Sequence, residues 1–349
     1  MSTSPSLTNS NPNPKSKTTT AQLALHFIED RSDPSTSSDS LISQLAHRQE
    51  LIAYWDIKEG SRVLEIGCGQ GDTTVALADA VGETGSVVAL DPGSPDYGSP
   101  STLLQAQSHI LSTPLGPRIT FHFTSPLTYL QSYAGPPFTH IVLSHCIYYF
   151  ASPHDLPLLL SAILPHAKDS KLCIAEWSLH ASRINQVPHV LTALLWSTLE
   201  SKREVGSDGN VRTVFSPVQI VQSVLETKLP SGTNTETASR IDVEQEEKVS
   251  SFRLVKQATF PSNPGLQDPF WEVSYLLSTR VKEVAALRER MGSGKLHISE
   301  AEIVVVEAAY DAIEAMVGSL EGGVKGVKWG AFVDIRLTEV LHKLRIAMT

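Results

Sequence analysis

Short apolar runs along the chain are separated by segments whose apolar residues recur at helical spacing. Strands that alternate with helices in this way form a mostly parallel sheet covered by helices on both faces. The pattern therefore predicts an α/β fold with a doubly wound, mostly parallel sheet. The predicted strands are Arg62–Ile66, Ser86–Asp91, Ile119–Phe123, His140–Ser144 and Lys171–Trp177.

The pattern changes at both ends of this region. Residues 1–20 are mostly Ser, Thr, Asn, Pro and Lys, which predicts a disordered tail because little can be buried. Residues 21–180 form the predicted core, with a helix over Leu41–Trp55 before the first strand. Residues 181–349 form a predicted helical insert or cap that also carries the last strands of the sheet. Its predicted helices are Gln186–Glu200, Ser216–Glu226, Phe270–Met291 and Ser299–Leu320; its strands are Phe252–Phe260 and Gly330–Leu337, the second followed by a short helix.

The clearest chemical signal is the stretch Val63–Asp72, where a buried strand leads through three alternate glycines into a helix. Glycine allows positive φ angles and close approach of a ligand to the backbone. The start of the helix presents free N–H groups to a polar group of that ligand. Asp91 ends the next predicted strand, where a carboxylate can accept hydrogen bonds from a ribose diol. The stretch therefore predicts a nucleoside-cofactor site at the carboxyl edge of the sheet.

The spacing of the glycines distinguishes between cofactors. A dinucleotide motif, G-x-G-x-x-G/A, needs a small residue at position 72, where this chain has Asp72. That carboxylate would repel a pyrophosphate. The sequence Glu65-Ile66-Gly67-Cys68-Gly69-Gln70-Gly71 instead resembles motif I of the class I S-adenosylmethionine-dependent methyltransferases.

The resemblance covers roughly residues 41–177 and implies S-adenosyl-L-methionine as the cofactor of the core. In this family the glycine loop holds the methionine moiety, the acid after the second strand holds the ribose, and the residue after the third strand contacts adenine. Carried over, the cofactor-binding residues are Glu65, Gly67, Cys68, Gly69, Gly71, Asp91, Pro92, Ser125, Ser144 and His145. The short sequences Asp96-Tyr97-Gly98 and Ser144-His145-Cys146 also resemble the corresponding sequences of fungal methyltransferase-domain proteins.

Catalytic and substrate-binding candidates follow the fourth and fifth predicted strands. A hydroxyl or thiol acceptor needs a base, and the pKa of histidine suits that task. His145 is the first candidate, with the alternative that it only orients the cofactor. His180 is the second, with the alternative of a solvated loop residue. Aromatic faces can hold a flat substrate, so the predicted substrate-binding residues are Tyr148, Tyr149 and Trp177, with core packing as the alternative.

The composition and net charge of the chain indicate which kinds of partner it can bind. A net charge of -9 argues against a nucleic-acid partner, since phosphate binding needs a Lys/Arg surface. We expect no membrane span, and the three cysteines fall in or beside predicted buried strands, which suits a cytoplasmic protein. Ser125 and Ser144 stand at two strand ends where a metal-dependent enzyme would need carboxylates, so we predict no metal. The two long C-terminal helices could form a homodimer interface.

Together these features predict a methyltransferase that acts on a small organic molecule, with O-methylation favoured over N- or S-methylation and substrate choice set by the C-terminal part. One alternative is a cofactor-binding protein of this fold with a non-methylating or regulatory role. Another is a protein methyltransferase, hinted at by the acidic stretch over residues 242–247, although a solvated loop also explains that stretch.

Overall fold

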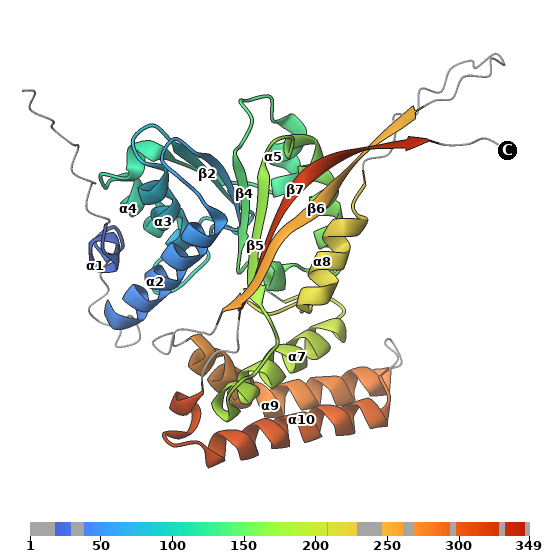
Figure 1. The fold of residues 1–349 in the computed structure, drawn as a ribbon. Coiled ribbons are helices and arrows are strands. Elements are labelled where there is room, and N and C mark those ends of the chain that lie inside the picture. Colours follow the sequence, from blue (N-terminus) through green and yellow to red (C-terminus); the bar gives the residue numbers. More distant parts are fainter. Residues whose placement is uncertain are drawn as a thin grey trace, which may run out of the picture.

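The computed structural model describes residues 18–28, 38–207, 209–228, 246–260, 268–293, 298–327 and 332–345. Most of the predicted tail over residues 1–20, and most of the acidic stretch over residues 242–247, lie outside these ranges. The described part forms a sheet flanked by helices and a separate helical layer below it (Figure 1).

The sheet is seven-stranded, with the order β3-β2-β1-β4-β5-β7-β6. Strands β1 to β5 pair in parallel, whereas β7 runs antiparallel to both of its neighbours, β5 and β6. The predicted mostly parallel sheet is therefore confirmed, and the first five strands have the predicted bounds. The strands are β1 (Arg62–Ile66), β2 (Ser86–Asp91), β3 (Ile119–Phe123), β4 (His140–Ser144), β5 (Lys171–Trp177), β6 (Glu246–Phe260) and β7 (Phe332–Arg345).

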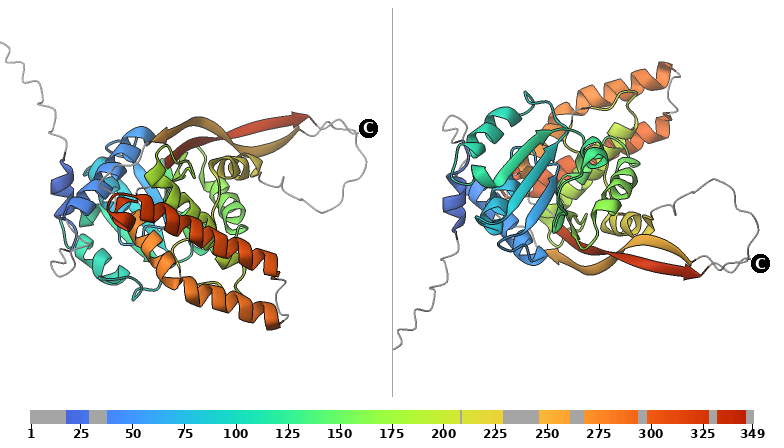
Figure 2. Two further views of the ribbon diagram at one scale, coloured as in Figure 1. Left: turned by 90° about the horizontal axis from the view of Figure 1, so that it is seen from below. Right: turned by 90° about the horizontal axis from the view of Figure 1, so that it is seen from above.

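Helices cover both faces of the sheet, as views from below and above show (Figure 2). Side chains alternate across a strand, so neighbouring residues of β1 serve different layers. Val63 packs in one buried cluster with residues of α2 and α3, whereas Leu64 packs in a second cluster with α5, α6 and α8. The helices of these layers are α1 (Thr20–Ala24), α2 (Ser38–Trp55), α3 (Asp72–Val81), α4 (Leu103–Leu111), α5 (Pro126–Ser132), α6 (Asp155–Ile163) and α8 (Pro217–Glu226).

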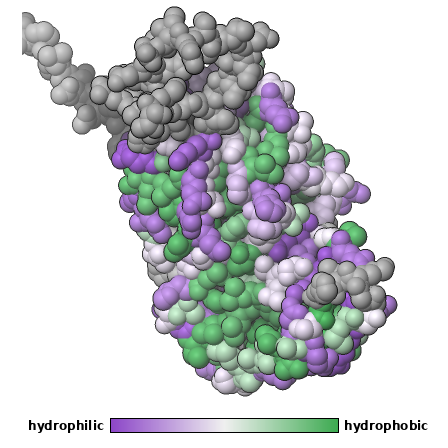
Figure 3. Space-filling view, turned by 90° about the vertical axis from the view of Figure 1, so that its right-hand side faces the viewer, coloured by the Kyte–Doolittle hydropathy of each residue, from purple (hydrophilic) through white to green (hydrophobic). Residues whose placement is uncertain are grey.

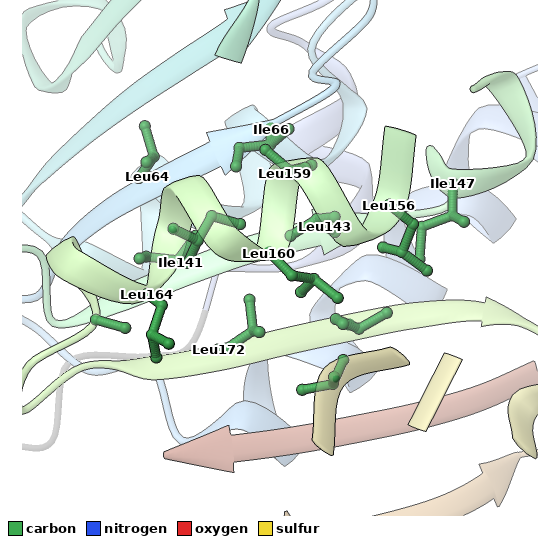
Figure 4. Close-up of a cluster of buried hydrophobic side chains, with 14 of the residues drawn as sticks. Leu64, Ile66, Ile141, Leu143, Ile147, Leu156, Leu159, Leu160, Leu164 and Leu172 are labelled. Carbon is green, nitrogen blue, oxygen red and sulfur yellow. The ribbon is translucent and has the colours of Figure 1, made fainter. Parts of the chain in front are cut away.

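The second cluster explains why α6 docks on the sheet. Leu156, Leu159, Leu160 and Ile163 recur at helical spacing and are all buried. In Figure 4 the labelled Leu156, Leu159 and Leu160 lie beside the strand residues labelled Ile141, Leu143 and Leu172, and all four helix residues share a buried cluster with these strands. Burying a leucine side chain contributes about 1.5–3 kcal/mol, so this apolar face holds α6 on β4 and β5.

The C-terminal helices form a cap below the carboxyl ends of the strands (Figure 1). Helices α7 (Val187–Ser201), α9 (Asp268–Ser293) and α10 (Glu300–Ser319) share a buried cluster that includes Leu195, Leu276, Tyr310 and Ile313. Figure 3 shows hydrophobic residues gathered over the lower half of one face, where the cap lies. A largely apolar groove of about 240 Å³ in the cap is lined by residues of α7, α9 and α10 and of the segments beside them, and by none of the glycine loop.

Three expectations about elements were incomplete or wrong. Helix α5 was not predicted, because it is one short element that begins with Pro126 directly after the third strand. The sequence also predicts Ser101 as the cap of a helix that ends near Leu111; helix α4 begins at Leu103 instead and is capped by Thr102, which forms the capping box with Gln105. Within the described residues up to 345, Leu337 is not followed by the predicted short helix, because β7 continues to Arg345. Apolar residues at 337, 340, 341 and 344 have helical spacing, but pairing with β6 along residues 338–345 overrides it.

Candidate functional site

The glycine loop has the backbone conformation that its sequence predicts. Gly67, Gly69 and Gly71 have φ angles of 76°, 53° and 101°, values that glycine adopts without steric cost. A Cβ atom on Gly67 would lie 2.5 Å from the Cβ atom of Cys146, so the loop packs closely against the tip of β4. A Cβ atom on Gly69 would meet nothing within 4 Å. The loop is therefore supported from behind and open at its middle residue, as a cofactor cradle requires.

Asp91 fixes the loop from the tip of β2. Its Oδ2 atom accepts a hydrogen bond from the Gly69 backbone N–H at 2.8 Å, and its Oδ1 atom accepts one from Gly93 at 2.8 Å. Gln107 donates to the Gly69 carbonyl from the other side, also at 2.8 Å. A carboxylate has about four acceptor positions, so Asp91 keeps capacity for a ribose diol while it holds the loop.

Glu65 lies buried beneath the loop. Its Oε2 atom accepts a hydrogen bond of 2.6 Å from the Thr74 hydroxyl in the first turn of α3. Burial raises the pKa of this carboxyl to about 7, against the opposing effects of the Thr74 bond and the Arg48 charge. Near neutral pH, Glu65 is thus poised between its charged and protonated forms.

This raised pKa predicts a pH-dependent effect of Glu65→Gln on the ligand-free protein. The raised native pKa means that the folded state binds more protons than the unfolded state between about pH 4.5 and 7, so the Glu65 contribution to stability falls as pH rises through that range. The glutamine has no such cost and can still accept from Thr74. The free energy of unfolding of the variant, taken relative to that of the wild type, should therefore increase between pH 5 and pH 8 by up to about 3 kcal/mol. Urea unfolding at the two pH values measures this difference. An equal difference at both pH values would contradict the raised pKa.

His145 follows the tip of β4 in a strained backbone conformation. Its φ angle is 53°, which is uncommon for a residue with a side chain, and its backbone N–H donates to the Ala175 carbonyl at 2.8 Å. Its Nε2 atom lies 2.9 Å from Nε2 of His47 on α2, and its Nδ1 atom lies 3.8 Å from Oε1 of buried Glu176. Burial lowers the pKa of His145 well below its usual value, with Arg48 and His47 adding to the shift. His145 is therefore a neutral imidazole between a second imidazole and a carboxyl.

Glu176 completes this group from the end of β5. Its Oε2 atom accepts from the backbone of Ile147 at 3.0 Å, and its Oε1 atom accepts from that of Trp177 at 3.1 Å. Burial raises the pKa of Glu176 to about 7, although these backbone bonds oppose the shift. The carboxyl thereby ties the segment after β4 to the tip of β5.

The other predicted cofactor residues lie along the same edge, with unequal exposure. Ser144 is buried, and its hydroxyl accepts a hydrogen bond of 3.2 Å from Thr73. Cys68 is buried within the loop, and burial raises the pKa of its thiol well above its usual value. Pro92 is exposed, and Ser125 directly precedes α5 without capping it through its side chain. Their roles as cofactor contacts stay predictions.

The predicted substrate residues separate into buried and exposed ones. Tyr148 is buried and donates to the Phe215 carbonyl at 2.9 Å, and its ring lies edge-on to Trp177 with centroids 5.1 Å apart. Tyr149 is 47% exposed, and His180 is exposed just beyond β5. The structure thus brings Tyr148 and Trp177 together and leaves Tyr149 and His180 at the surface; their functional roles stay predictions.

A second histidine–carboxylate pair lies where the core meets the cap. His189 of α7 is buried, and its Nε2 atom lies 2.9 Å from Oε2 of Glu272 on α9. The His189 ring is also 4.4 Å from the ring of Trp177. Farther along α7, Trp196 stacks with Tyr275 of α9 at 5.7 Å. Aromatic and imidazole rings therefore continue from the tip of β5 into the cap.

Sequence reasoning missed His47, Arg48, Glu176, His189 and Glu272. The signal for Glu176 was present, because an ionisable residue stood inside a run predicted to be a buried strand. His47 and Arg48 lie in a helix that was predicted before the first strand without any role in the site, and nothing in the sequence shows which helix face meets β4. The pairing of His189 with Glu272 joins residues 83 positions apart.

Two further checks concern metals and membranes. Among the described residues, no group of three or more His, Cys, Asp or Glu side chains is arranged to hold a metal ion. Within the same ranges, no helix is both long enough and apolar enough to cross a membrane.

Similarities to known proteins agree with this geometry. A family model described as protein-L-isoaspartate(D-aspartate) O-methyltransferase matches residues 26–95. The methyltransferase phomM of Diaporthe leptostromiformis is 27% identical over 150 residues, which cover 38% of this chain and 38% of that protein. The demethylmenaquinone methyltransferase of Bacillus cereus is 45% identical over 64 residues, 18% of this chain and 27% of the enzyme. The chain thus spans less than two fifths of the length of these curated relatives.

One solved structure is similar along nearly its whole length. It is a cyclopropane-fatty-acyl-phospholipid synthase-like protein from Lactobacillus casei ATCC 334, with 27% identity and a TM-score of 0.67. The similarity covers 91% of this chain and 98% of that one. The sheet order, the glycine loop and these similarities show that the chain has the fold of the class I S-adenosylmethionine-dependent methyltransferases. Its cofactor is S-adenosyl-L-methionine, as the sequence resemblance implied.

Proposed function

We propose that this protein transfers the methyl group of S-adenosylmethionine to a small organic molecule, with an oxygen atom as the favoured acceptor. The observation that carries the proposal is the hydrogen bond from Gly69 to Asp91, which holds the open glycine loop and the carboxylate predicted to bind the ribose in one arrangement. When bound, the cofactor supplies an electrophilic methyl group on its sulfonium sulfur.

The acceptor class is inferred from the rings at the junction of core and cap. The ring of Trp177 lies edge-on to the rings of Tyr148 and His189. A stacked pair of rings, Trp196 and Tyr275, lies farther into the cap. Flat apolar molecules pack well against such faces. The net charge of -9 supports a small molecule over a nucleic acid. A cytoplasmic location, independence from metals and a homodimer through the C-terminal helices remain parts of the proposal.

The base for a hydroxyl acceptor is proposed among the histidines at this edge. His145, the first candidate, is uncharged and could accept a proton, but His47 engages its Nε2 atom in the structure. His180 is exposed, beyond the tip of β5. His189 has a carboxylate partner, Glu272, which would stabilise the imidazolium formed by proton uptake. Replacing each histidine by glutamine and comparing kcat would identify the base.

Similarity to the Lactobacillus casei protein supports a second acceptor class. That protein is described as cyclopropane-fatty-acyl-phospholipid synthase-like, and the similarity includes the cap. A phospholipid with unsaturated acyl chains is therefore the alternative acceptor, with a carbon–carbon double bond in place of a hydroxyl.

The test is calorimetric titration followed by a turnover screen. S-adenosylmethionine and S-adenosylhomocysteine should bind, and NAD⁺ should not. S-adenosylhomocysteine release is then measured with phenols, amines, thiols and vesicles of unsaturated phospholipid. Turnover with a phenol supports the proposal, and turnover only with vesicles supports the lipid alternative. Cofactor binding without turnover favours a non-methylating or regulatory role.

A further inference from the structure

Arg48 lies on α2, next to the residue that docks this helix onto the tip of β4. The neighbouring His47 places its Nε2 atom 2.9 Å from Nε2 of His145. The Arg48 Nε atom is buried and has no hydrogen-bond partner within the described residues. A buried donor that stays unpaired costs about 1–3 kcal/mol, so Arg48 has a donor available for a ligand.

Besides the His47 and His145 imidazoles, the ionisable groups on which the charge of Arg48 acts are buried carboxyl groups. Glu65 shares a face of β1 with Val63, which packs in the layer of α2 and α3, and Asp72 is the first residue of α3. Burial raises the pKa of Glu65, Asp72 and Glu176, and the charge of Arg48 opposes the shift at all three. The geometry agrees with this, because His47, the residue before Arg48, contacts His145, and His145 lies 3.8 Å from Glu176 at the end of β5. Helix α2 thus brings Arg48 to the carboxyl edge of the sheet, where the glycine loop lies.

The methionine moiety of the cofactor carries an ammonium group and a carboxylate. The acidic groups around the loop suit the ammonium but repel the carboxylate. A guanidinium binds a carboxylate through paired N–H donors, which is a strong charge-assisted interaction. The carboxylate consequently needs a cation at the loop, and Arg48 supplies one.

We propose that Arg48 binds the α-carboxylate of the cofactor's methionine moiety, which makes α2 part of the cofactor site. This inference rests on the proposed function, because it assumes that S-adenosylmethionine binds at the glycine loop. It adds a binding residue from a helix that precedes the glycine motif and carries no part of it.

The experiment pairs a protein variant with a ligand variant. Calorimetry measures the affinities of S-adenosylhomocysteine and of its carboxamide, in which a neutral amide replaces the carboxylate. The wild type should prefer the acid by roughly 10- to 100-fold, the range expected for a charged hydrogen bond. Arg48→Met should lose most of this preference and bind the two ligands about equally. Arg48→Lys, which keeps the charge, should retain part of it.

Arg62→Met is the matched control. Arg62 is also a half-buried arginine with an unpartnered Nε atom, but it starts β1 at the opposite edge of the sheet and donates to Ser86 and Tyr133. This variant should keep the wild-type preference for the acid. A general loss of structure would lower the affinities for both ligands in parallel and leave the preference for the acid unchanged.

Two results would overturn the inference. One is a wild type that binds acid and carboxamide equally, which needs no folded variant to observe. The other is a preference that survives in Arg48→Met. If the wild type binds neither ligand, the proposed function itself fails, and this inference fails with it.

Discussion

Asp91→Ala is expected to reduce the affinity for S-adenosylhomocysteine by about 3–6 kcal/mol, on the order of a hundredfold or more. The carboxylate has two tasks, and the alanine removes both. It fixes the Gly69 and Gly93 backbones by hydrogen bonds of 2.8 Å each, and in its proposed role it offers its remaining acceptor positions to the ribose. Isothermal titration calorimetry of the two proteins measures the effect.

Asp91→Asn is the matched control. The asparagine oxygen can still accept one backbone hydrogen bond, but the side-chain amide group cannot accept the second. Its affinity should therefore fall between those of the wild type and the alanine variant. Circular dichroism melting of both variants separates lost binding from lost folding. An alanine variant that folds and binds as tightly as the wild type would rule out Asp91 as the ribose acceptor.

The core strands could be predicted closely because a buried parallel strand leaves a short apolar run bounded by turn residues. Val87–Leu90 and Ile141–Leu143 are such runs, and all their residues are buried. The loop was predictable for a related reason. Three alternate residues of the loop have positive φ angles, and glycine adopts such angles without steric cost. Local sequence fixed both features.

The parts of the site that were missed depend on contacts between distant elements. His47 and His145 are 98 positions apart, and their pairing depends on the angle at which α2 crosses the end of β4. The far half of β7 shows the same limit. Its apolar spacing favours a helix, and only the long β6 partner, distant in sequence, makes a strand the better arrangement. Contacts between elements that are distant in sequence determine these features, so local sequence patterns could not predict them.

Gly67 and Gly69 are expected to differ when each is replaced by alanine, although both have positive φ angles. An alanine Cβ atom at position 67 would lie 2.5 Å from Cβ and 3.1 Å from Sγ of Cys146, which is buried at the tip of β4 and cannot easily move. Overpacking of this kind costs about 1–3 kcal/mol, and the left-handed backbone adds roughly 1–2 kcal/mol. Gly67→Ala should therefore lower the free energy of unfolding by about 2–5 kcal/mol.

Gly69→Ala meets no atom within 4 Å, so its stability cost should be only that of the left-handed backbone, roughly 1–2 kcal/mol. Its methyl group instead projects into the open side of the loop, where we place the cofactor. This variant should stay folded and lose affinity for S-adenosylhomocysteine. Urea unfolding and calorimetry on both variants test the difference. If Gly69→Ala bound the cofactor normally, the open side of the loop would not be the cofactor site; if Gly67→Ala were as stable as Gly69→Ala, close packing against Cys146 would not be what requires glycine there.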